Sequence, residues 1–347
     1  MKVAILTGGG DCPGLNAVIR AVVRRGEQHG FEFTGVRDGW KGLLEDDHFR
    51  VTRQNTSGIL QLGGTILGTS RTNPFKRADG PQIVMDALAR HHIGAVVAIG
   101  GEDTLGVAAR FHAIGMNVVG VPKTIDNDLS GTDYTFGFDT AVTIATEAID
   151  RLHSTAKSHD RVMVVEVMGR NAGFIALNSG ISGNADVILI PEIPFDIEKV
   201  CDKLMENELN GHKYAIVVAA EGAMPVGGDV VVKGGAEGGR QHVVLGGIAE
   251  YVAKEISKRT GKDSRSLVLG HLQRGGSPST FDRLLSLRFG AAAVRAIEEG
   301  KFDHMVALKS PDIGLVPLGE ALGIQKRVRP DDDKVLTARD LGICFGD

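Results

Sequence analysis

The chain has 347 residues, a formal net charge of −4 and three widely spaced cysteines. This length is typical of two lobes of ordinary size, each able to bury a core. The small net charge excludes a general attraction to nucleic acid, and the spacing of Cys12, Cys201 and Cys344 matches neither a zinc site nor a disulfide framework. No apolar run reaches the ~18 residues of a membrane span. We therefore expect a cytoplasmic protein with reduced thiols and with no nucleic-acid or membrane partner.

Apolar runs alternate with helical patterns along the chain. We predict buried strands at 2–7, 94–99, 117–121, 162–167, 186–190 and 214–220. We predict helices at about 15–28, 81–92, 104–115, 138–158, 197–208 and 245–260. This alternation is typical of parallel sheets that are covered by helices on both faces. The predicted fold class is therefore α/β, with two lobes that are each a mostly parallel sheet sandwiched by helices.

The two lobes are predicted to be interleaved in sequence. We place the first boundary just before the long helix 138–158, where a fresh series of strands and helices begins. The glycine-rich stretch 227–247 predicts a hairpin or a flexible surface connection. Helix 245–260 and the loop after it are predicted to return to the first lobe. The predicted lobes are therefore 1–137 plus about 250–303, and 138–249 plus about 304–347.

A glycine loop, TGGGDCPG at 7–14, joins the first strand to the first helix. Free N–H groups and the helix dipole at such a junction favour a phosphate. The loop lacks the Gly-Lys-Ser/Thr of a Walker A motif and the spacing of a dinucleotide fingerprint. It is consistent with phosphate binding and also with a merely tight strand-to-helix turn.

Two further loops follow predicted strands and carry acids. Glu102 and Asp103 come after Gly100 and Gly101, and a carboxylate beside a polyphosphate needs a bridging cation, so Glu102 is a natural Mg²⁺ ligand. Both acids are also compatible with the start of a helix.

The loop at 122–128, PKTIDND, places Asp126 and Asp128 on one side of an extended segment, with Lys123 upstream. One carboxylate can act as a base toward an alcohol, its neighbour can help to position the metal or the nucleophile, and the lysine can neutralise the transferred group. The alternative is that the two acids are ordinary turn formers.

These loops, with motifs farther along the chain, resemble the phosphofructokinase family. The further matching motifs are GGTILGTSR at 63–71, Arg161, Met168-Gly169-Arg170, Glu221, Arg265 and HLQRGG at 271–276. The resemblance implies transfer of a phosphoryl group to the C1 hydroxyl of fructose 6-phosphate, giving fructose 1,6-bisphosphate, with Mg²⁺ as cofactor. It further implies that the first lobe binds the phosphoryl donor and the second binds the sugar phosphate, with the active site in the cleft.

The resemblance also implies the residue roles. Asp126 is the base, Glu102 serves the metal, and Arg71 and Arg170 balance the charge of the transferring group. The donor-binding set is Gly9, Gly10, Gly101, Asp103 and Lys123, with Asp103, Lys123 and Asp128 also placed in the catalytic set. The sugar-binding set is Thr124, Ile125, Asp126, Met168, Gly169, Arg170 and Glu221, and the 6-phosphate clamp is Arg161, Arg265, His271 and Arg274. In the family Arg161 and Arg265 come from a neighbouring subunit, which implies a homodimer or homotetramer.

The donor loops depart from the ATP-dependent bacterial pattern, which reads Gly-Gly-Asp-Gly-Ser and Pro-Gly-Thr-Ile-Asp-Asn-Asp. Asp103 stands where the first of these motifs has its third glycine, and Lys123 stands where the second motif has its glycine. A carboxylate at 103 occupies the place of the α-phosphate of ATP and repels it, whereas pyrophosphate has no such group. The pair resembles the pyrophosphate-dependent branch, for which we expect a reversible glycolytic and gluconeogenic step.

Other functions remain open at this point. An ATP-dependent 6-phosphofructokinase that tolerates Asp103, or a donor site of mixed preference, keeps every motif named above. A silent sugar-phosphate sensor is disfavoured because Asp126, Glu102, Lys123 and Arg170 are all present. An NAD kinase shares the Gly-Gly-Asp-Gly-Thr type of loop but explains neither the 161–170 motifs nor the 265–275 motifs.

Overall fold

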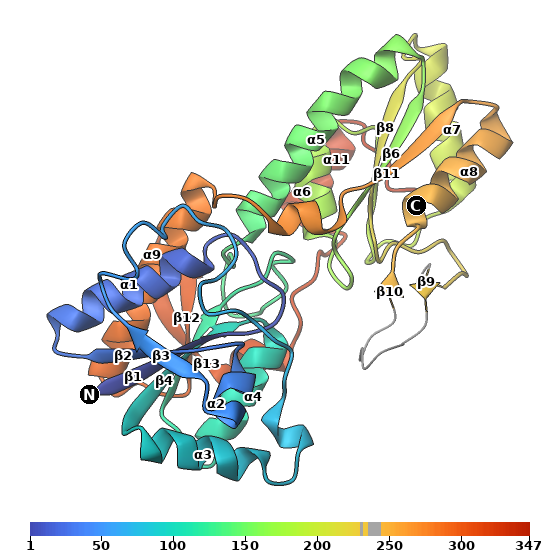
Figure 1. The fold of residues 1–347 in the computed structure, drawn as a ribbon. Helices are drawn as coiled ribbons and strands as arrows, with labels where there is room; N and C mark the ends of the chain where they lie inside the picture. Colours follow the sequence, from blue (N-terminus) through green and yellow to red (C-terminus); the bar gives the residue numbers. More distant parts are fainter. Residues whose placement is uncertain (230–231, 235–243) are drawn as a thin grey trace. The chain divides into compact units, whose positions relative to one another are not determined.

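Two units make up the chain in the computed structural model, which describes residues 1–229, 232–234 and 244–347. The first unit contains Met1–Thr140 and Arg274–Gln325, and the second contains Ala141–Gln273 and Lys326–Asp347. Each is an open α/β sheet with helices on both faces (Figure 1). The chain therefore leaves the first unit, returns to it and leaves it again.

Two of the expected boundaries need correction. Helix 248–260 and the strand after it belong to the second unit, not the first, because that strand pairs with β6 (Val162–Val167) from Ser264↔Val162 to Val268↔Glu166. Conversely, the strands after residue 303 belong to the first unit, since β12 (His304–Lys309) pairs with β5 (Val118–Pro122) at His304↔Val119. Strand patterns reveal that a segment is extended, but not which of two sheets it joins.

The first unit contains a seven-stranded sheet in the order β13-β12-β5-β4-β1-β2-β3. The five central strands are parallel, and the two edge strands β3 and β13 run antiparallel to their neighbours. The strands are β1 (Lys2–Thr7), β2 (Glu32–Val36), β3 (His48–Val51), β4 (Ile93–Gly100), β5 (Val118–Pro122), β12 (His304–Lys309) and β13 (Asp312–Pro317).

Helices cover both faces of this sheet, which explains why its central strands are continuous apolar runs. Helices α1 (Leu15–Gln28) and α9 (Thr280–Glu298) lie on one face, where a Cβ at Gly290 would lie 2.7 Å from the Ala21 Cβ (Figure 1). Glycine at 290 thus lets the two helices approach closely. The other face is covered by α2 (Trp40–Glu45), α3 (Gly80–Arg90), α4 (Glu102–His112) and α10 (Leu318–Gly323). A short 3₁₀ turn, η1 (Pro74–Lys76), precedes α3.

The second unit is built on a four-stranded, fully parallel sheet in the order β11-β6-β8-β7. Its strands are β6 (Val162–Val167), β7 (Val187–Leu189), β8 (Ala215–Ala220) and β11 (Ser264–Val268). Helices α7 (Ile197–Leu209) and α8 (Ile248–Thr260) pack on one face, and α5 (Phe138–Ser158), α6 (Phe174–Ser182) and α11 (Asp333–Asp340) lie on the other (Figure 1). The 3₁₀ turn η2 (Gly270–Arg274) follows β11.

The glycine-rich stretch 227–247 is described only in part. Strands β9 (Val232–Gly234) and β10 (Val244–Leu245) pair antiparallel, as a hairpin requires. The remainder of that prediction falls on 230–231 and 235–243, which lie outside the described residues. Within the described part of the chain, no helix is both long and apolar enough to cross a membrane.

Candidate functional site

Three loops of the first unit start at neighbouring strand ends. Strand β1 pairs with β4 up to Thr7↔Ile99, and β4 pairs with β5 up to Gly100↔Pro122. The loops that begin after Thr7, Gly100 and Pro122 therefore start at one edge of the sheet. This is the edge at which open α/β sheets bind ligands.

The glycine loop is held by backbone bonds to the strand beside it and to the 63–71 segment. The Gly8 N–H donates to the Ile99 carbonyl at 2.9 Å, and the Gly9 N–H donates to the Ser70 carbonyl at 3.0 Å. The Thr69 hydroxyl donates to the Gly9 carbonyl at 2.6 Å. With φ of +81°, Gly9 adopts a backbone conformation that favours glycine.

Thr104 explains two of the glycines around it. A Cβ at Gly8 would lie 2.4 Å from the Thr104 Oγ1, and a Cβ at Gly100 would lie 2.3 Å from the Thr104 Cβ. Thr104 is buried, so its side chain fills the space between the first two loops. Our sequence reasoning gave Thr104 no role, although it closes the GGEDT segment.

Lys123 links the first loop to the third. Its side chain is 4% exposed, and its Nζ donates to the Gly10 carbonyl. Its backbone N–H donates to the Gly100 carbonyl at 3.0 Å, so it also contacts the second loop. Burial lowers the pKa of the Lys123 ammonium, and the nearby charge of Arg274 acts in the same direction.

Arg274 also lies against the glycine loop. Its Nη1 donates to the Asp11 carbonyl at 3.0 Å, and a Cβ at Gly10 would lie 2.8 Å from that nitrogen. The structure thus places Arg274 in the first unit, beside Lys123, rather than with Arg161 and Arg265. Two cationic side chains beneath a loop of small residues form an environment that favours a phosphate.

Glu102 and Asp103 occupy the first turn of α4 and are both exposed. The N-cap residue is Gly101, so neither acid is the N-cap itself, but both lie at the start of the helix, as the alternative expected, where the helix dipole favours acidic side chains. Mg²⁺ prefers carboxylate oxygens and bound water, and two exposed carboxylates at the strand end beside the glycine loop fit that preference. Glu102 and its neighbour Asp103 are the residues of this loop that could hold Mg²⁺.

The third loop is fixed mainly by its neutral residues. The Thr124 hydroxyl accepts the Asp126 N–H at 3.1 Å, and the Asn127 Oδ1 accepts the Thr135 N–H at 3.0 Å. Asn127 has φ of +54°, a conformation that asparagine tolerates better than most residues. Asp126 is half-buried, and the Asp128 Oδ2 accepts the Gln325 amide at 3.0 Å. Ile125 is buried, and Arg71 is exposed.

In the second unit, four predicted sugar-site residues follow the ends of two adjacent strands. Met168, Gly169 and Arg170 come after β6, and Glu221 comes after β8, with its N–H bonded to the Val167 carbonyl at 2.9 Å. The Gly222 N–H donates to the Gly169 carbonyl at 3.1 Å, and a Cβ at Gly222 would lie 2.0 Å from the Arg170 carbonyl oxygen. Glycine at 222 therefore allows the two loops to touch.

Gln273 supports this group, and our sequence reasoning gave it no role. Its side chain is fully buried, and its Oε1 accepts the Met168 N–H at 3.3 Å. Its Nε2 donates to the Gly270 carbonyl at 3.0 Å. The HLQRGG motif therefore contributes a positioning residue as well as the exposed His271.

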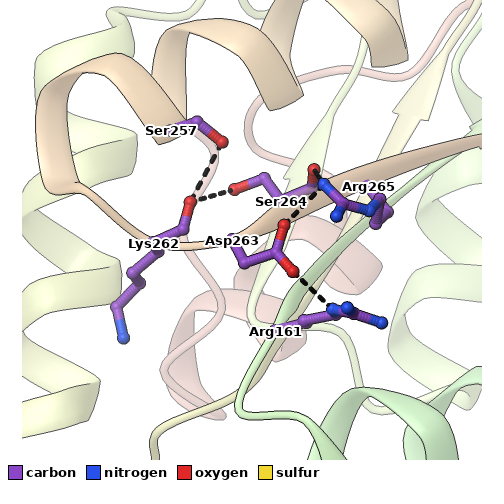
Figure 2. Close-up of polar contacts among 6 residues, drawn as sticks. All are labelled: Arg161, Ser257, Lys262, Asp263, Ser264 and Arg265. Atoms are coloured by element: carbon purple, nitrogen blue, oxygen red, sulfur yellow. Dashed lines mark hydrogen bonds and ion pairs between the residues drawn. The ribbon is translucent and has the colours of Figure 1, made fainter.

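Arg161 and Arg265 form a separate cluster around Asp263 (Figure 2). The Arg161 Nε lies 2.6 Å from one carboxylate oxygen of Asp263, and an Arg265 Nη1 lies 2.5 Å from the other. Both guanidinium groups remain partly exposed, at 31% and 57% of their side-chain area. Our sequence reasoning missed Asp263, although an acid two residues before Arg265 was visible.

The turn that carries Asp263 is held by two serines. The Ser257 and Ser264 hydroxyls both donate to the Lys262 carbonyl, at 3.0 and 3.3 Å (Figure 2). This turn follows Gly261, which ends α8 in a left-handed conformation with φ of +74°. The Asp263 carboxylate is thus presented to both arginines from a fixed backbone.

The Arg161–Arg265 cluster and the Met168–Arg170 group lie at opposite ends of the strands of the second unit. Arg161 directly precedes β6, and Met168 directly follows it. At ~3.3 Å per residue, the strand separates their Cα atoms by roughly 20 Å. One chain therefore does not bring Arg161 and Arg265 together with the Met168–Arg170 group.

A family model described as Phosphofructokinase matches residues 2–297 of the chain. The chain belongs to the phosphofructokinase family. Within this family it is 56% identical over 348 residues to a protein of Streptomyces coelicolor named pyrophosphate–fructose 6-phosphate 1-phosphotransferase, with 100% of both chains covered. It is 52% identical over 355 residues to an ATP-dependent 6-phosphofructokinase of Chloroflexus aggregans, with 100% of this chain and 98% of the relative covered.

A solved structure supports the same phosphofructokinase membership. The phosphofructokinase of Saccharomyces cerevisiae matches with a TM-score of 0.83 and 31% identity, over 93% of this chain. The match covers 45% of the yeast chain. The α/β fold predicted from the alternation of strand and helix patterns is thus confirmed.

Proposed function

We propose that this phosphofructokinase transfers a phosphoryl group from pyrophosphate to the C1 hydroxyl of fructose 6-phosphate, with Mg²⁺. The products are fructose 1,6-bisphosphate and phosphate. The observation that carries the choice of donor is the exposed Asp103 carboxylate in the first turn of α4, directly after Gly101. The 56% identity to a relative named for pyrophosphate supports the same choice.

The first unit binds the donor. The backbone of Gly9, Gly10 and Gly101 lets pyrophosphate approach closely, and Lys123 keeps the glycine loop in place through the Gly10 carbonyl. Glu102 holds the magnesium, whose charge offsets that of the phosphates. A donor with an α-phosphate meets the Asp103 carboxylate, which repels it. Pyrophosphate lacks that group.

Asp126 acts as the base. As the C1 oxygen of the sugar bonds to a phosphorus of pyrophosphate, the bond from that phosphorus to the leaving phosphate breaks and the hydroxyl proton passes to the Asp126 carboxylate. Arg71 and Arg170 balance the charge of the transferring group. Asp128, held by the Gln325 amide, keeps the loop of Asp126 in place.

The second unit binds the sugar. Its Met168, Gly169, Arg170 and Glu221 bind the sugar, and its His271 binds the 6-phosphate. Because Arg161 and Arg265 lie at the far edge of their sheet, we propose that they complete this site in a neighbouring copy. The active enzyme is then a homodimer or a homotetramer with shared sites.

Pyrophosphate as the donor also makes the reaction reversible. Its transfer potential is closer than that of ATP to the potential of a sugar phosphate, so the step runs in both directions and serves glycolysis and gluconeogenesis. We place this step in the cytoplasm. The 52% identity to a relative named ATP-dependent makes ATP the second candidate donor.

The test is a donor comparison with the full-length enzyme. Initial rates are measured at saturating fructose 6-phosphate and Mg²⁺ with pyrophosphate or ATP, and in reverse with fructose 1,6-bisphosphate and phosphate. We expect turnover with pyrophosphate, little with ATP, and a reverse rate of the same order as the forward one. Turnover with ATP alone would assign the chain to the ATP-dependent enzymes.

A further inference from the structure

Two histidines and an aspartate of the first unit converge outside the loops described above. Asp46 is the C-cap residue of α2, His48 is the first residue of β3, and His91 is the C-cap residue of α3. The chain thus brings together two segments that are separated by more than forty residues. None of the three belongs to the donor or sugar sets.

The distances within the group are those of potential ligands. The His91 Nε2 lies 2.6 Å and the His48 Nε2 lies 3.6 Å from the same oxygen of Asp46, Oδ1. One ligand atom of each residue lies within 4.8 Å of the others. Tetrahedral ligands with bonds of ~2.0–2.1 Å are roughly 3.3 Å apart, and both distances to the Asp46 Oδ1 differ from that separation by less than 1 Å.

The surroundings orient these ligands. The other Asp46 oxygen, Oδ2, is held by the Arg90 guanidinium at 2.8 Å, which leaves Oδ1 turned toward the two imidazoles. The imidazole rings meet edge to face, with centroids 4.1 Å apart and an interplanar angle of 74°. Side-chain exposures of 20% for His48, 24% for His91 and 40% for Asp46 leave room for water as a fourth ligand.

We propose that Asp46, His48 and His91 bind one divalent ion of the zinc type. Two imidazole nitrogens and one carboxylate oxygen suit Zn²⁺ and its first-row neighbours, whereas Mg²⁺ prefers oxygen ligands alone. Binding through both Nε2 atoms places the imidazole protons on Nδ1. The ion joins the turn between α2 and β3 to the end of α3, and it therefore stabilises the edge of the seven-stranded sheet.

The test uses the full-length protein freed of transition metals with a chelator and kept in excess Mg²⁺ so that oxygen sites are filled. Zn²⁺ binding is measured by titration calorimetry for the wild type, His48→Ala, His91→Ala and Asp46→Asn. The control is His159→Ala, which removes an exposed histidine outside the cluster. We expect the wild type and the control to bind one equivalent that each cluster variant binds at least about tenfold more weakly.

Two further readouts keep the test decisive. Zn²⁺ should raise the midpoint of thermal unfolding of the wild type and the control but not of the cluster variants, whose folding is checked by circular dichroism. Co²⁺ should give a visible spectrum without a thiolate charge-transfer band, since the group contains no cysteine. Equal zinc binding by wild type and cluster variants, no binding by the wild type, or a thiolate band would overturn the proposal.

Discussion

The two units present their functional side chains in different ways. In the first unit, three loops start at neighbouring strand ends, and Lys123 and Arg274 hold the glycine loop. In the second unit, the side chains are divided between two edges of one sheet, with Arg161 before β6 and Met168 after it. A single chain thus brings the three loops of the first unit together, whereas it keeps Arg161 and Met168 apart at the two ends of one strand.

Removal of the proposed base, Asp126, should reduce catalysis more than the other changes predicted below. We expect Asp126→Asn to lower kcat by about 10²–10⁴-fold, because the amide cannot accept the hydroxyl proton, while KM for fructose 6-phosphate changes little. Steady-state kinetics measures both parameters. Asp128→Asn is the matched control and should lose much less, since an amide can still bond to Gln325. A kcat within tenfold of wild type for Asp126→Asn would remove Asp126 from the role of base.

The division of the second unit predicts complementation between variants. Arg161→Ala should raise KM for fructose 6-phosphate about 10–100-fold, because a charge-assisted bond to phosphate is lost. In a shared site, Asp126 and Arg161 come from different copies. In a purified mixed dimer of Asp126→Asn with Arg161→Ala, one site then carries both substitutions and the other carries neither, so about one half of the sites are restored.

The complementation is measured by co-expressing the two variants with different tags and assaying the purified mixed oligomer. The parent variants mixed without exchange of subunits are the control. Mixed oligomers with no more activity than the control would mean that Arg161 does not complete the site of a neighbouring copy.

A smaller effect concerns the segment by which the chain leaves the first unit. The Asp282 Oδ2 accepts the Thr140 N–H at 2.7 Å and the Thr140 hydroxyl at 2.6 Å. Burial raises the pKa of Asp282 from 3.8 to about 6. Between these values the folded chain holds a proton that the unfolded chain has lost, so the free energy of unfolding falls as pH rises, by roughly 3 kcal/mol in all.

We therefore expect Asp282→Asn to flatten the pH profile of stability between about pH 4 and 6. Urea unfolding across this window measures it, with the exposed Asp312→Asn as the control. Profiles of the same slope for wild type and Asp282→Asn would show that this carboxyl does not titrate as proposed.

Local pattern predicted much of the fold. The predicted strand 2–7 and helix 15–28 coincide with β1 and α1, because a continuous apolar run and a helical apolar stripe are properties of the segment itself. The assignment of segments to units was less successful. Strands β11 and β12 join the sheets opposite to those expected, since the choice of partner strand depends on contacts far apart in sequence.

In the candidate site, too, the residues that follow a local pattern were predicted and those defined by contacts distant in sequence were not. The loops around Gly9, Glu102 and Asp126 were visible because each follows an apolar run. Thr104 and Asp263 were not recognised, since their importance arises from what they touch: two glycines in one case and two arginines in the other. Such contacts are set by packing and leave only a weak trace in the sequence.

The most direct test of pyrophosphate as the donor is the donor preference of Asp103→Gly, measured as kcat/KM for pyrophosphate and for ATP beside the wild type. Asp103→Asn, which keeps the size and removes the charge, separates steric from electrostatic exclusion. We expect the wild type to turn over with pyrophosphate, and Asp103→Gly to lose much of this rate while gaining affinity for ATP. A wild type that uses ATP but not pyrophosphate, with a preference unchanged in Asp103→Gly, would contradict the assignment of pyrophosphate as the donor.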